Sequence, residues 1–62
     1  MQKGTVLSVD VREGKGFIKA EDGSVIMFLL SSVIGDMVEE EEKVSYDIVE
    51  DPELQAVNVQ KA

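Results

Sequence analysis

A chain of 62 residues with a net charge of −7, from 13 acidic and 6 basic residues, has room for one domain only. The sequence contains no cysteine, which excludes a disulfide framework and a thiolate metal site, so packing alone has to hold the fold. The excess of acid opposes diffuse attraction to phosphate backbones and lowers, without removing, the expectation of a nucleic-acid ligand.

The apolar runs of the chain are short. The longest, residues 25–30, is far below the roughly 20 residues that span a bilayer, and the first four residues lack the apolar core of a signal peptide. We therefore expect a cytoplasmic protein that does not contact the membrane.

The first half of the chain predicts three strands joined by two turns. Residues 5–11 are rich in β-branched side chains, with a change of face near Ser8 and Val9, and the two glycines within residues 12–16 indicate a turn or bulge. A second strand follows over about residues 15–20. Residues 21–24 then predict a tight turn, because Asp-Gly supplies the positive φ that a hairpin connection needs. Residues 25–30 are apolar throughout, so their length favours a strand while periodicity does not say which side is buried.

The second half is less regular. Ser32 could cap a helix, but Gly35 would cost that helix about 1 kcal/mol, so residues 31–43 predict one short helical turn followed by a loop. The run Glu39–Glu42 is typical of a solvated loop rather than a cation site, because hard cations need carboxylates fixed in a cage. Residues 44–49 alternate cleanly and predict a fourth strand, residues 50–53 a turn, and residues 56–59 a fifth strand.

Five short antiparallel strands within 62 residues suggest a small closed or nearly closed barrel. Closure removes exposed strand edges, which benefits strands as apolar as these. We expect one domain that spans residues 1–62.

Motifs of one small barrel family run along almost the whole chain. Residues 3–6, Lys-Gly-Thr-Val, match a Gly-Thr-Val or Gly-Lys-Val opening, and residues 14–18, Gly-Lys-Gly-Phe-Ile, match Gly-Phe-Gly-Phe-Ile. Residues 25–34 run parallel, without gaps, to a Val-Phe-Val-His and Ser-Ala-Ile segment, with Phe28, Ser32 and Ile34 retained. The chain thus resembles the cold-shock domain, the small bacterial OB-fold that binds single-stranded RNA and DNA. The resemblance implies an all-β, five-stranded antiparallel barrel of cold-shock type.

The outer sheet face departs from the family pattern. The family's Lys-Trp-Phe-Asn run is replaced by residues 7–10, Leu-Ser-Val-Asp, Lys15 stands at the first phenylalanine of the glycine motif, and Leu30 stands at the histidine. Phe17 and Phe28 remain, and the resemblance implies that their rings lie side by side on this face, where bases would stack. Since each stacked base is worth about 1–3 kcal/mol, the loss of most rings predicts weak binding.

The first hypothesis is therefore a module that binds single-stranded RNA or DNA weakly and with little sequence preference. Phe17 and Phe28 would stack bases, Lys15 and Lys3 would meet phosphates, and Lys19 would add positive charge at the rim. We favour this hypothesis, because the fold and two rings match the family.

The second hypothesis comes from a different class. The same face is an apolar patch, and such patches often mark contact with a protein partner or with a second copy of the chain. Nucleic-acid binding would then be lost, as it could be in an engineered variant of the fold, and the contact residues would be Leu7, Phe17, Phe28 and Leu30. The two rings could also persist only because they stabilise the sheet by cross-strand packing.

Catalysis is not expected. Without histidine or cysteine, base or thiolate chemistry would need a buried carboxylate or lysine, and nothing in the sequence places one beside a nucleophile. Ser31 and Ser32 are better explained as caps of the following turn, and Lys15 lacks the surroundings of a phosphate-binding loop. We expect no catalytic residue, no metal, no cofactor and no small-molecule substrate.

Overall fold

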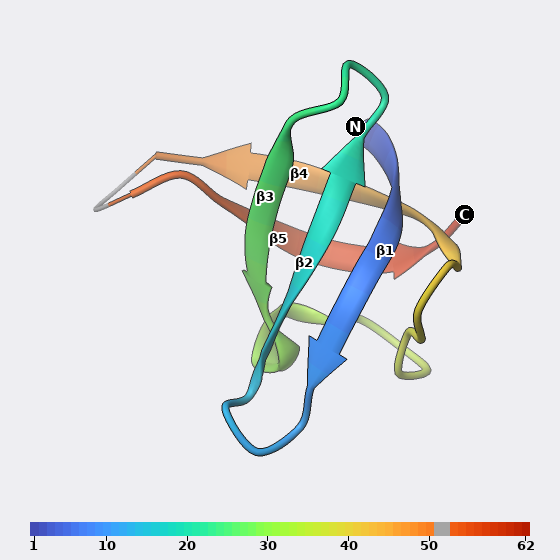
Figure 1. Ribbon diagram of the computed structural model, residues 1–62, viewed down its shortest axis with the longest axis vertical. Helices are drawn as coiled ribbons and strands as arrows, with labels where there is room; N and C mark the ends of the chain where they lie inside the picture. The colour runs from blue at the N-terminus through green and yellow to red at the C-terminus, as the bar shows by residue number, and fades with distance from the viewer. Residues whose placement is uncertain (51–52) are drawn as a thin grey trace.

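The computed structural model describes residues 1–50 and 53–62, and the predicted turn at residues 50–53 includes Asp51 and Pro52, which lie outside the described residues. The strands are β1 (Gln2–Asp10), β2 (Lys15–Ala20), β3 (Val25–Leu29), β4 (Lys43–Val49) and β5 (Gln55–Lys61) (Figure 1). A 3-10 helix, η1 (Leu30–Ser32), follows β3. Within the described ranges, no helix is long and apolar enough to cross a bilayer.

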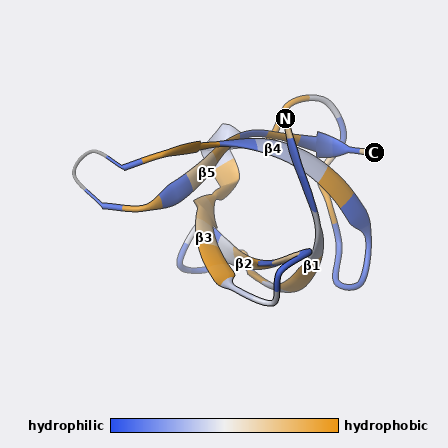
Figure 2. Cartoon of the chain, turned by 90° about the horizontal axis from the view of Figure 1, so that it is seen from above, coloured by the Kyte–Doolittle hydropathy of each residue, from blue (hydrophilic) through white to orange (hydrophobic). Residues whose placement is uncertain are grey.

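The five strands close into a barrel in the order β1-β2-β3-β5-β4, with β4 pairing back onto β1 (Figures 1 and 2). The predicted closed barrel is confirmed. The strand pairs are antiparallel as predicted, except that β3 and β5 run parallel over a short contact at Met27–Gln55 and Phe28–Ala56. The reason is geometric: an odd number of strands cannot close a ring through antiparallel pairs alone.

Strand β1 contains a bulge and pairs with both β2 and β4. Its register against β2 shifts between Val6 and Ser8, so that Val6 is buried and Val9 packs against the core although the two are three positions apart. The change of face predicted near Ser8 and Val9 is present, slightly earlier than expected. The first half of β1 also pairs with β4, from Gln2–Tyr46 to Thr5–Lys43.

Phe28 lies at the centre of the wall formed by β2, β3 and β5. Its cross-strand partners are Gly16 on β2 and Ala56 on β5, both buried. A Cβ atom added to Gly16 would lie 2.7 Å from Cζ of the Phe28 ring and 2.6 Å from the carbonyl oxygen of Ser8. The ring therefore occupies the space that the missing side chain leaves, with a large residue packed between two small ones.

The rest of the core comes from all five strands and from one loop. Its apolar side chains surround Phe28 inside the barrel, and Val38 is the member that the loop between η1 and β4 contributes. The buried core residues are Val6, Ile18, Ile26, Phe28, Val38, Val44, Tyr46, Ala56 and Val59.

The segment after β3 follows its prediction in outline, since one helical turn is followed by a loop. The capping role predicted for Ser31 and Ser32 is wrong. Both serines lie inside η1, and the N-cap position is Leu29, which makes no side-chain cap bond. The loop is anchored instead by Val38 in the core and by a parallel bridge between Val33 and Val59.

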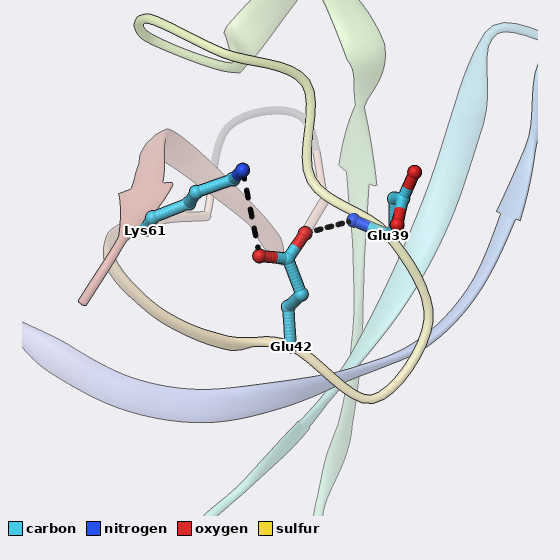
Figure 3. Close-up of polar contacts among 3 residues, drawn as sticks. All are labelled: Glu39, Glu42 and Lys61. Carbon is cyan, nitrogen blue, oxygen red and sulfur yellow. Dashed lines mark hydrogen bonds and ion pairs between the residues drawn. The ribbon is translucent and has the colours of Figure 1, made fainter.

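The acidic run Glu39–Glu42 is a loop fixed onto β1. Glu41 N–H donates to the carbonyl oxygen of Val6 at 2.8 Å, and Val6 N–H donates to the carbonyl oxygen of Glu42 at 2.9 Å. The Glu42 carboxylate accepts a bond from Glu39 N–H at 2.7 Å and pairs with Lys61 Nζ at 3.6 Å (Figure 3). Among the residues described, no cluster of acidic side chains could hold a metal ion.

The packing of Phe28 against Gly16 can be tested by unfolding. We expect Phe28→Ala to lower the free energy of unfolding by about 3–5 kcal/mol, because it leaves a cavity at the barrel centre. Gly16→Ala should cost about 1–3 kcal/mol through overpacking. Urea unfolding followed by circular dichroism measures both, and Phe28→Leu replaces the alanine variant if that variant does not fold.

The matched control is Val25→Ala on the same strand, where the side chain is exposed and the change should stay within about 0.5 kcal/mol. A Phe28 variant no less stable than this control would contradict the packing role of the ring.

Candidate nucleic-acid interface

The strands β1, β2 and β3 present one outer face to solvent. Cross-strand pairing arranges its side chains in three rows that run from β1 through β2 to β3, with Leu7 at the bulge beside the middle row. We define the outer face by these rows, which are Thr5–Lys19–Val25, Ser8–Phe17–Met27 and Asp10–Lys15–Leu29.

The turn between β2 and β3 sets the register of this face. Ala20 N–H donates to the carbonyl oxygen of Ser24 at 2.8 Å, and Gly23 N–H donates to that of Ala20 at 2.9 Å. The loop proper therefore holds three residues, with Gly23 at a φ of 94°, as three-residue hairpin loops favour. The positive φ predicted for the Asp-Gly pair is confirmed at its glycine. A four-residue loop would have paired Phe17 with Phe28, whereas the shorter loop pairs it with Met27.

Phe28 is not on the outer face. Its side chain is 0% exposed, and the alternation along β3 turns Ile26 and Phe28 inward and Met27 and Leu29 outward. The expectation that this ring stacks on bases beside Phe17 is wrong, because a shift of one residue moves every side chain of a strand to the other face. Leu30 was also expected outside, but it lies in η1 and packs against the core.

The apolar part of the outer face is thus different from the predicted set. Phe17 is 36% exposed at its centre, and Leu7 and Leu29 are 44% and 40% exposed. Met27, directly opposite Phe17, completes the group. One feature of the sequence indicates the observed register. Gly16 has no side chain and leaves space inside the barrel, so a large residue such as Phe28 is expected opposite it on the next strand.

The predicted cations are distributed over two regions. Lys15 and Lys19 lie on the outer face, on either side of Phe17 along β2, and Lys15 is opposite Asp10. Lys3 lies beyond this face, where β1 pairs with β4 opposite Ser45. The structure therefore places Lys15, predicted to meet a phosphate, and Lys19, predicted to add charge at the rim, on either side of the exposed ring, and Lys3, the other predicted phosphate contact, apart from it.

Hydrogen bonds in the β2–β3 turn lower the pKa of one carboxyl group, that of Asp22. The backbone N–H and Oγ of Ser24 both donate to Oδ1 of Asp22, the former at 2.9 Å, and they hold the pKa of this carboxyl below its ordinary value of 3.8.

Burial, and then the charges of Asp22 and Glu21, raise the pKa of Tyr46 above its ordinary value of 10.0. The Tyr46 ring therefore stays neutral inside the barrel at neutral pH.

A closed five-stranded barrel that presents a three-stranded outer face is the architecture of OB-fold modules. The sequence model described as the 'Cold-shock' DNA-binding domain matches residues 2–62, and the chain belongs to this cold-shock domain family. "Cold shock protein CspC" of Bacillus subtilis (strain 168) is 36% identical over 66 aligned residues, which cover all of both chains.

Among solved structures, "drosophila Unr CSD456" superposes with a TM-score of 0.85 over 98% of this chain and 26% of that one. The two sequences are 22% identical, so this likeness shows the fold alone.

The observed register also changes which residues of β3 share the outer face with Phe17. These are Met27, which is paired with Phe17, and Leu29, which is paired with Lys15. Of the two rings that seemed retained, Phe17 is the one on the outer face.

The turn makes a prediction for acid titration. We expect the Asp22 carboxyl to titrate below 3.8 in an NMR pH series, and Ser24→Ala to move the midpoint back toward 3.8. Because the folded-state pKa is lowered, the contribution of this carboxylate to stability is present above the unfolded pKa and is lost as the pH falls through the folded one. A midpoint at or above 3.8 in the unmodified protein would rule out these bonds in solution.

Proposed function

We propose that this domain binds single-stranded RNA or DNA weakly, with little sequence preference, through the outer face around Phe17. The observation that carries the proposal is an exposed ring at the centre of this face with Lys15 and Lys19 on either side along the same strand. Membership of the cold-shock family, whose members are generally nucleic-acid-binding proteins, supports the same assignment.

The spacing along β2 suits a strand of nucleic acid. Residues two apart on a strand lie on the same face and roughly 7 Å from each other, so each ammonium group can reach a phosphate next to a base that stacks on Phe17. Stacking is tolerant of sequence, because every base has a π-face. Met27 and Leu29 add apolar surface without hydrogen-bonding groups that would distinguish one base from another.

The expected affinity is low for two physical reasons. One ring on the face supplies about 1–3 kcal/mol of stacking, and Asp10 beside Lys15 together with the net charge of −7 weakens phosphate contacts. Binding should therefore be measurable at low salt and should decline steeply as salt is added.

A second candidate function rests on the exposure of Leu7, Phe17 and Leu29 on one face. A protein partner or a second copy of this chain could cover these side chains, since exposed apolar patches often mark such contacts. Association of this kind would grow with protein concentration and would be largely insensitive to salt.

One titration separates the two functions. With short oligothymidine at low salt, we expect the amide NMR signals of Lys15, Phe17 and Met27 to shift, and Phe17→Ala to weaken binding by about 1–3 kcal/mol. Leu54→Ala, which removes an exposed apolar side chain outside the outer face, should leave the affinity unchanged. Shifts absent at high micromolar oligothymidine would exclude the nucleic-acid function, and a concentration-dependent dimer in parallel sedimentation would favour the second.

The register of β3 gives a gain-of-binding test. Met27→Phe places a second ring directly opposite Phe17, and we expect it to raise the affinity for oligothymidine by about 1–3 kcal/mol. The double variant Met27→Phe with Phe17→Ala should bind about as weakly as the unmodified domain. Unchanged affinity in the single variant would mean that bases do not lie over this row.

A further inference from the structure

Three lysines from three strands line a hollow at the edge of the outer face, to which Thr5 and Lys19 also belong. The hollow has a volume of about 450 Å³, and its lining comes mainly from the start of β1, the end of β2 and the start of β4. We call it the lysine hollow, and its lining is formed by Lys3, Gly4, Thr5, Lys19, Ala20, Glu21, Lys43, Val44 and Ala62.

Strand pairing explains why the lysines converge. Thr5 is paired with Lys19 on β2 and with Lys43 on β4, so it lies between the two. Lys3 is two residues before Thr5 on β1 and lines the same hollow. Half of the six basic residues of the chain are thus gathered at one place.

The charge of the lysine hollow is opposite to that of the whole chain. Its lining includes three lysines and one acidic residue, Glu21. Within residues 1–50 and 53–62, the ion pair that forms is Lys61 with Glu42, which uses none of these three lysines. An anion would therefore meet a local excess of positive charge and the hydroxyl group of Thr5 as a further donor.

The size of the hollow indicates what kind of anion fits. Its volume is within the range of about 300–1,000 Å³ typical of small-ligand sites, so it has room for a phosphate together with the sugar attached to it. Lys19 also connects the hollow to the outer face, since it follows Phe17 by two residues on β2, a distance of roughly 7 Å along the strand.

We propose that the lysine hollow binds a phosphate group, and that this group is a backbone phosphate of the nucleic-acid strand that stacks on Phe17. This inference rests on the proposed function and adds Lys43 and Thr5 to the residues that meet the ligand. A free phosphate compound would present the same chemistry, so the test has one arm for each source.

The first arm uses inorganic pyrophosphate at low ionic strength. We expect saturable shifts of the amide signals of Gly4, Thr5 and Lys43, which sodium chloride at equal ionic strength does not produce. Lys43→Gln should weaken this binding severalfold, and Glu21→Gln should strengthen it, because one removes an attractive charge and the other a repulsive one. Lys61→Gln removes the same unit of charge outside the hollow and should have little effect.

The second arm uses oligothymidine and measures log K against log salt concentration. If a backbone phosphate occupies the hollow, Lys43→Gln should reduce the magnitude of the slope by about 0.7, the value for one phosphate contact on a single strand. Lys61→Gln should leave the slope unchanged.

The outcomes separate the two proposals. Binding of pyrophosphate with an unchanged oligothymidine slope would overturn the assignment to the strand and leave a site for a free phosphate compound. Binding of neither at the hollow would overturn the inference, while shifts around Phe17 with oligothymidine would leave the proposed function standing. Binding of pyrophosphate without any binding of oligothymidine would overturn the proposed function and again leave the hollow as a separate phosphate site.

Discussion

The packing of the Phe28 ring against Gly16 determines both the core and the surface of this domain. The ring fills the barrel where Gly16 and Ala56 leave space for it, and this fixes β3 in one register against β2. The same register decides that Met27, and not an aromatic residue, lies beside Phe17 on the outer face. A contact buried in the core therefore sets the number of rings available for stacking, and with it the affinity expected of the surface.

The charge of the molecule is unevenly distributed, which its net value conceals. The glutamates of residues 39–42 are held on a loop along β1, where Glu42 is engaged by Lys61 and by the backbone of Glu39. The lysines of β1 and β2 lie on the outer face and around the adjoining hollow, which is also lined by Lys43, the residue after Glu42. An acidic protein can thus carry several lysines close to the proposed ligand, although its net charge weakens attraction at long range.

Much of the fold could be predicted from local sequence, and the errors have physical causes. The span of β2 and the turn glycine follow from short-range patterns, and residues 15–20 form the strand that the sequence predicts. The outer face of β3 could not be predicted in the same way, because six consecutive apolar residues carry no period and its orientation depends on whether the preceding loop has three residues or four. Lys43 was missed for another reason: its position beside Thr5 results from a pairing of strands far apart in the sequence.

The odd number of strands in the barrel has a consequence for where the barrel opens. The parallel joint between β3 and β5 extends over two residues of each strand, whereas the antiparallel pairs extend further. Local opening of a protein begins where the fewest interactions have to be broken. The barrel wall is therefore expected to open most easily between β3 and β5. Phe28 links this strand pair to the β2–β3 hairpin, because it is paired with Gly16 on one side and with Ala56 on the other. In native-state hydrogen exchange, the amide protons that bond between β3 and β5 would exchange first in such a subglobal opening.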